Sequence, residues 1–152
     1  MSFITTLYDE IYSIITTNFP TRLELKNAYD IRNNIDQQLK NGYGVQFLGL
    51  SNTNEINNGF RVYTREIIVT FTGQIISTEM NTTPKKVVEK KLLEDQKILI
   101  EKILTNKNIV SNVVQLEITD DDGIEMVYDE QKNFAMIKTR IDAKFYLDLT
   151  CL

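Results

Sequence analysis

Hydrophobic and polar residues alternate over two long stretches of this chain. In residues 133–149 the odd-numbered positions are mostly apolar, and charged side chains take even-numbered positions: Lys138, Arg140, Asp142, Lys144 and Asp148. Residues 60–76 repeat the pattern, with Ile67, Val69 and Phe71 on one side and Thr70 and Thr72 on the other. Because successive side chains of a β-strand point to opposite faces, both stretches predict strands with one apolar face.

These two predicted strands are long for a chain of this size. Seventeen residues, as in 60–76 and 133–149, extend over roughly 50 Å at about 3.3 Å per residue. A compact domain of 152 residues does not need strands of that length. We therefore expect each strand to bend, or to project beyond the core as an arm of a hairpin.

Two other stretches have the period of an amphipathic helix. In residues 2–18 the apolar side chains recur three and four positions apart, and Ser2 is a suitable N-cap. Pro84 fits the first turn of a second helix, which continues to residue 104. The side chains of this helix that are predicted to face inward are Val88, Leu92, Leu99, Ile100 and Ile103.

The segment between the first helix and the first long strand predicts shorter elements. Residues 30–42 are typical of a short polar helix, with Asp30 as N-cap, Gly42 at its end and a narrow apolar stripe of Ile31, Ile35 and Leu39. Residues 43–50 predict a strand. Residues 51–59 have the asparagine, serine and glycine content of an exposed loop.

The C-terminal third predicts three strands. Residues 113–119 and 124–128 are expected to form a hairpin around the turn at residues 120–123, extended by the last long strand. Strands with one apolar face belong to a largely antiparallel sheet, and the two amphipathic helices cover that face. The expected class is α+β in one domain, residues 1–152, with a largely antiparallel sheet, two helices on one face and one short polar helix.

Composition removes several kinds of function. The chain has no histidine, which is the commonest general base and metal ligand, and its one cysteine cannot form an internal disulfide. A net charge of -4 argues against sequence-specific binding of nucleic acid or attachment to anionic lipid. No segment is typical of a signal peptide or of a membrane span, so we expect a protein made in a cytosol. We expect no enzyme activity and no cofactor.

One acidic cluster offers an alternative. Asp120, Asp121 and Asp122 precede Gly123, and carboxylates can hold a hard cation. Three consecutive residues rarely converge on one ion, so a solvated turn is favoured over a metal site. We expect this turn and the predicted loop at residues 51–59 to form the partner interface, through the side chains of Asn52, Asn54, Glu55, Asn57, Asn58, Asp120, Asp121 and Asp122.

The order of these segments resembles that of the tail terminator or tail-completion proteins of long-tailed bacteriophages. Members of that group are small, commonly begin with an amphipathic helix, and place a second helix between a long-stranded hairpin region and the C-terminal strands. The matching segments cover most of the chain: residues 3–15, 60–76, 85–104 and 133–149. The short helix at residues 30–42 departs from that plan.

The resemblance implies a structural virion protein without an active site. It would form a ring, usually a homohexamer, that caps the tail tube at the head–tail junction and offers a docking surface to the head connector. Its partners would be other copies of the chain, the tail tube protein and the connector or neck protein. The alternatives are another neck or head-completion component, a metal-dependent enzyme using Asp120 to Asp122, and a generic intracellular binding module.

Overall fold

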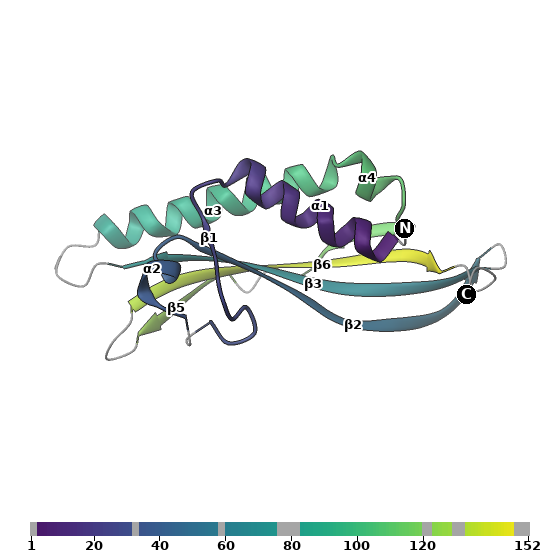
Figure 1. Ribbon diagram of the computed structural model, residues 1–152, viewed down its shortest axis with the longest axis horizontal. Helices are drawn as coiled ribbons and strands as arrows, with labels where there is room; N and C mark the ends of the chain where they lie inside the picture. The colour runs from purple at the N-terminus through teal and green to yellow at the C-terminus, as the bar shows by residue number, and fades with distance from the viewer. Residues whose placement is uncertain are drawn as a thin grey trace.

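The computed structural model describes residues 3–31, 34–57, 60–75, 83–119, 123–128 and 133–147. Within these residues six strands form one sheet, mostly antiparallel, and two long helices lie on one of its faces, which confirms the α+β class (Figure 1). The long elements are α1 (Phe3–Asn18), β2 (Gly42–Asn57), β3 (Phe60–Gln74), α3 (Thr83–Leu104) and β6 (Asn133–Leu147). The short elements are β1 (Leu23–Glu24), α2 (Asp36–Leu39), α4 (Lys107–Val110), β4 (Gln115–Ile118) and β5 (Ile124–Tyr128).

The strand order is β1-β2-β3-β6-β4, with β5 also paired to β6. Only the pair β1–β2 is parallel. The predicted hairpin between residues 113–119 and 124–128 is wrong, because β4 and β5 each run antiparallel to β6 and follow one another along its edge. Each of these short strands thereby forms backbone hydrogen bonds with a strand of 15 residues. That strand offers more backbone partners than the two short strands offer each other.

The main core lies between the helices and the sheet. The alternation predicted for the long strands is confirmed, since the odd-numbered residues of β3 and β6 supply most of the sheet's share of this core. In α3 the predicted inward positions Leu92, Leu99 and Ile103 are fully buried. The buried members from α1 are Leu7, Ile11, Ile14 and Ile15. The predicted cap Ser2 and the strand residues Ile76, Asp148 and Leu149 lie outside the part that the structure describes.

A second, smaller core covers one end of the opposite face of the sheet. Figure 1 shows the connection between α1 and β2 crossing the edge of the sheet and turning beneath it. The buried residues of this second core are Leu25, Ile31, Leu39, Val127, Phe134 and Met136. The expectation of a single covered face is therefore wrong at this end, where Thr70 and Thr72 are buried instead of solvated.

This connection also corrects the predicted short helix. Among the described residues of this range the α-helix covers Asp36–Leu39 alone, and Ile35 is 55% exposed instead of joining the stripe. Gly42 does not end the helix but begins β2. A Cβ atom at Gly42 would clash with the Gln38 carbonyl and press on the Thr72 hydroxyl, so glycine is required there by close packing.

The predicted loop at residues 51–59 is also wrong, because β2 continues through Asn57. Asn52 lies opposite Tyr63 and Asn57 opposite Phe60, so the backbone of β3 provides a partner for this asparagine-rich segment. Pairing with the adjacent strand of the hairpin here overrides the weak preference of these residues for strand. The register shifts between Phe47 and Leu50 and again between Asn52 and Ile56, and such bulges bend and twist a strand.

The far end of the sheet extends past the helices. Phe3, at the start of α1, contacts Phe145 of β6, with 5.3 Å between ring centroids. Beyond that row, β2 and β3 continue through residues 53–57 and 60–62, a segment that we call the arm. Figure 1 shows the long strands curving and running past the N-terminus of α1. Both expected outcomes, bending and projection, are observed.

Three carboxylates lie side by side on the sheet face away from the helices. Asp142 of β6 is directly opposite Glu66 of β3 on one side and Glu117 of β4 on the other. Arg140 approaches Glu66 at 3.4 Å. The pKa of Asp142 is raised, first by burial and then by Glu66 and Glu117, while Lys144 opposes the shift. Like charges directly opposite each other destabilise a sheet.

Asp142→Asn is therefore expected to stabilise the protein at pH 7, by on the order of 0.5 kcal/mol. When the pKa of a carboxyl is raised in the native state, its contribution to stability is largest at a pH below the ordinary pKa of 3.8. This contribution is lost as the pH rises through the native pKa. Urea unfolding at pH 7 and pH 4 measures the effect, which should shrink at pH 4. The control is Glu125→Gln, because Glu125 lies opposite Met136. Equal stability of Asp142→Asn and the parent at both pH values would contradict the prediction.

Candidate functional site: a tyrosine-lined groove

One edge of the sheet is open along most of its length. On its outer side β2 pairs with β1 only at Gly42 and Tyr43. From Gly44 onward no strand in the described part of the chain pairs with that side of β2. An open edge presents backbone N–H and C=O groups to any extended segment that lies beside it. This edge is therefore able to accept another strand.

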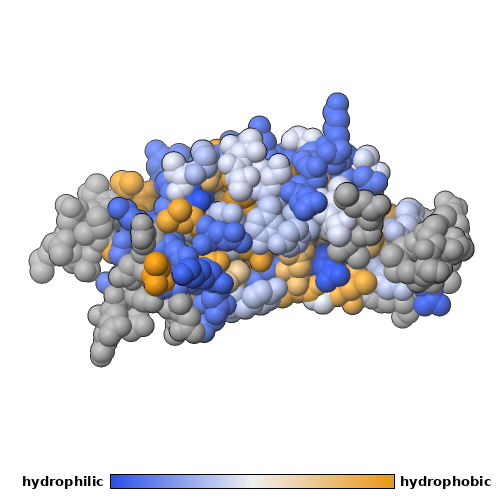
Figure 2. Space-filling view, in the orientation of Figure 1, coloured by the Kyte–Doolittle hydropathy of each residue, from blue (hydrophilic) through white to orange (hydrophobic). Residues whose placement is uncertain are grey.

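A groove of about 380 Å³ lies beside this edge, on the side of the sheet that α1 covers. It is lined by Tyr8, Tyr12, Tyr29, Val45, Phe47 and Arg65. The Tyr8 ring lies 4.7 Å from that of Tyr12 and 5.0 Å from that of Phe47. Tyr8 is 48% exposed and Tyr29 66% exposed, which is unusual for large aromatic residues of a small domain. In Figure 2, viewed from this side, apolar side chains gather below α1, over the long strands.

The polar groups of the groove are phenols and one guanidinium. Burial, followed by the hydrogen bond with Tyr8, raises the pKa of Tyr12 above its ordinary value, so this phenol stays protonated. Arg65 donates from Nη1 to the carbonyl of Leu48, at 2.6 Å, inside the first bulge of β2. Its Nε is buried and has no hydrogen-bond partner. Because this atom has almost no accessible surface, a group that enters the groove would not reach it without a rearrangement of the side chain.

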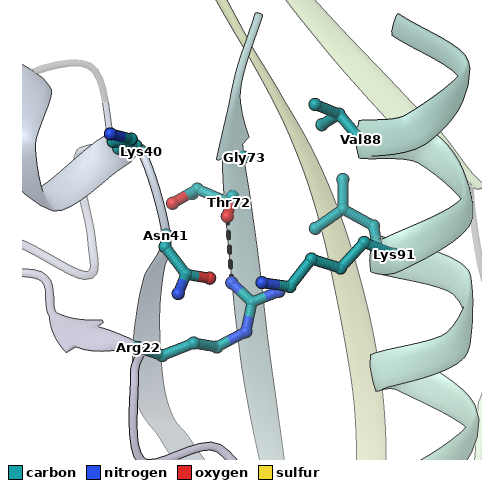
Figure 3. Close-up of a pocket in the computed structure, with 8 residues that line it drawn as sticks. Arg22, Lys40, Asn41, Thr72, Gly73, Val88 and Lys91 are labelled. Atoms are coloured by element: carbon teal, nitrogen blue, oxygen red, sulfur yellow. Dashed lines mark hydrogen bonds between the residues drawn. The ribbon is translucent and has the colours of Figure 1, made fainter. Parts of the chain in front are cut away.

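A second cavity contains an arginine that serves the fold instead. Arg22 donates from Nη1 to the carbonyls of Gly42 and Thr72, and from Nε and Nη2 to Asp95 of α3. Its guanidinium also lies 4.4 Å from the centre of the Phe71 ring. Burial lowers the pKa of Arg22, and the hydrogen bond that Arg22 donates to Asp95 opposes that shift. The cavity beside Arg22 has a volume of about 60 Å³, and Lys91 is among the residues that line it (Figure 3).

None of the predicted interface residues that the structure describes lines the groove. Asn52, Asn54, Glu55 and Asn57 lie in β2, toward and within the arm. Asn58 and the three acidic residues Asp120, Asp121 and Asp122 lie outside the described residues. Sequence analysis missed the groove, although Tyr8 and Tyr12 are four positions apart and share one side of a helix. The two tyrosines form a groove only beside the open edge of β2, and that edge depends on the strand order, which no local sequence pattern predicts.

Among the residues that the structure describes, no group of three or more His, Cys, Asp or Glu side chains is arranged to hold a metal ion. None of the helices in those ranges is both long and apolar enough to cross a membrane. No protein-family model matches the chain, and a search of curated proteins found no match either.

Proposed function

We propose that this chain is a structural subunit that assembles head to tail into a ring of six copies. The ring would cap the tail tube of a long-tailed bacteriophage at the head–tail junction and dock the head connector. The proposal assigns the chain no catalysis and no cofactor. It rests on the resemblance in the order of the segments and on one feature of the structure, the pair of unlike surfaces described next.

The first surface is the arm, where β2 and β3 continue beyond the row of Phe3 and Phe145. The second is an apolar flank that follows the C-terminal half of α3, α4 and the turn into β4. Its exposed side chains are Leu93 at 51%, Leu104 at 44%, Val110 at 45% and Val114 at 43%. Leu93 and Leu104 are eleven positions, about three turns, apart and share one side of the helix.

Two unlike surfaces on one chain suit a heterologous contact. In such a contact the arm of one copy lies on the apolar flank of the next, and the rotation between copies closes a ring or generates a filament. Closure gives an assembly of finite size. Exposed apolar side chains on neighbouring elements can form a protein contact site when they lie close together.

Leu104→Glu is expected to abolish ring formation while leaving the subunit folded. Leu104 is 44% exposed, so its replacement places a charge in the contact without entering the core. Native mass spectrometry reports the subunit number, and circular dichroism reports folding. Leu23→Glu is the matched control, because Leu23 is 46% exposed and lies in β1, away from the flank.

Electron microscopy of virions, with antibody against the protein, tests the location. Label at the head–tail junction and binding to purified tail tube protein are the expected results. Binding to the portal side alone would favour another neck or head-completion component. A monomer at every concentration that is absent from virions and has no affinity for tail tube protein would refute the proposal.

A further inference from the structure

We infer that the groove beside β2 is a docking site for an extended acidic segment of a different protein. The segment adds as a strand to the open edge of β2 and places an apolar side chain and a carboxylate in the groove. This site is separate from the arm and from the apolar flank, so it does not depend on ring formation.

The open edge provides the backbone part of the site. Between residues 44 and 51, β2 pairs with β3 at residues 44–47 and at residues 50–51, with a bulge between them, and no described strand pairs with its other side. Eight residues extend over roughly 25 Å, long enough for a peptide to form several backbone hydrogen bonds. Affinity in strand addition comes from these bonds, and specificity comes from pockets that receive alternate side chains.

The aromatic walls provide the pocket. At about 380 Å³ the groove is large enough for an aromatic side chain and a neighbour two positions along the strand, which points the same way. Tyr8, Phe47 and Tyr29 offer ring faces and edges for such a side chain. The exposed fractions of Tyr8 and Tyr29 would then be covered by the docked segment.

Charge selects an acidic occupant. Arg65 is the cation among the residues that line the groove, and its Nη1 donates to the Leu48 carbonyl. A carboxylate that enters the groove would pair with this guanidinium through a charge-assisted interaction. Glu24 lies near two of the phenols: burial is the first cause of the raised pKa of Tyr12 and of Tyr43, and the charge of Glu24 adds to both shifts. Glu24 is not among the residues that line the groove.

A second copy of the chain fits this site less well. The opposite edge of the sheet offers β4 and β5, of four and five residues, so neither matches residues 44–51 of β2 in length. Leu116 and Ile118 of β4 and Ile124 and Met126 of β5 lie opposite buried odd-numbered residues of β6, so they share the helix side of the sheet. All four of these side chains are apolar. They carry no carboxylate to Arg65.

The test uses a fluorescein-labelled peptide of nine residues. Threonine fills its odd positions, and valine, phenylalanine, glutamate and valine fill its even positions, so that phenylalanine and glutamate share a face. Fluorescence anisotropy is expected to show saturable binding. Replacing the peptide's glutamate with glutamine, or testing the Arg65→Gln protein, should weaken binding by about tenfold, as expected for one charge-assisted hydrogen bond.

Two further comparisons separate docking from a folding defect. Tyr29→Ala should also weaken binding, and Tyr29 is 66% exposed, so its removal leaves the core intact. Tyr146→Ala is the matched control, because Tyr146 is 40% exposed at the far end of β6. Methylating alternate backbone nitrogens of the peptide in one phase should abolish binding, and methylation in the other phase should not, since only one edge of an added strand bonds to β2.

Absence of binding at millimolar peptide would overturn the inference, and so would equal affinity for Arg65→Gln, Tyr29→Ala and the parent protein. Sedimentation that shows copies pairing through β2, with the pairing lost in Tyr29→Ala, would reassign the edge to self-association and also overturn it. The Leu104→Glu variant should bind the peptide like the parent. Loss of the ring with normal peptide binding, or the reverse, therefore distinguishes failure of one proposal from failure of the other.

Discussion

Replacing Ile141 with aspartate is expected to leave the protein largely unfolded at room temperature. Ile141 is fully buried in the main core, and on β6 it lies between Ile67 of β3 and Ile118 of β4. The substitution removes an apolar side chain and buries a charge for which the surrounding apolar side chains offer no partner. The combined cost is about 5 kcal/mol or more, which is comparable with the whole stability of many small domains.

Urea unfolding followed by circular dichroism measures this effect. Ile141→Val is the size control and should cost about 1 kcal/mol. Lys144→Glu is the control for the other face of the same strand, where Lys144 is only partly covered, and it should have little effect in the isolated subunit. A melting temperature of Ile141→Asp near that of the parent would refute the facing assigned to β6.

Arg22→Ala is expected to cost about 3–5 kcal/mol, as is typical when one partner of a buried ion pair is removed. The Arg22 side chain is 2% exposed and that of Asp95 is 14% exposed. Without the guanidinium, Asp95 loses its ion-pair partner, and the carbonyls of Gly42 and Thr72 lose the donor that joins them. The contact with the Phe71 ring is lost as well. Arg22 thus links the α1–β1 connection to β2, β3 and α3.

A double-mutant cycle with Asp95→Leu tests this role. Arg22→Met combined with Asp95→Leu should recover much of the lost stability, because two apolar side chains leave no buried charge unpaired. Arg61→Ala is the matched control, since Arg61 is an exposed arginine of the same sheet and should change stability by less than about 0.5 kcal/mol. Additive losses in the cycle would show that the pair does not act as a unit.

The candidate site could be predicted only in part. The two tyrosines Tyr8 and Tyr12 are readable from sequence as neighbours on one helix, but nothing in the sequence places them beside Phe47 and Arg65. The asparagine-rich segment at residues 51–59 looked like the interface because its composition is that of a loop. This segment instead pairs with β3 in a hairpin, Asn52 opposite Tyr63 and Asn57 opposite Phe60, and composition alone does not report that pairing.

The sequence by itself determined the elements whose periodicity is strong and the side of each that is buried. Alternation along β3 and β6 and the helical spacing in α1 and α3 come from hydrophobic side chains a few residues apart, so a local pattern is enough to predict them. That the chain has no histidine and one cysteine is likewise a property of composition alone.

Tertiary structure alone decided how the C-terminal strands pair and what covers the second face of the sheet. β4 and β5 lie end to end on β6 instead of forming a hairpin, and Thr72 is buried because a distant segment folds beneath the sheet. These outcomes depend on competition among backbone partners and apolar surfaces far apart in the chain. Strand pairing and the coverage of a sheet face are decided by which long-range contacts lower the free energy most, and no local window contains both members of such a contact.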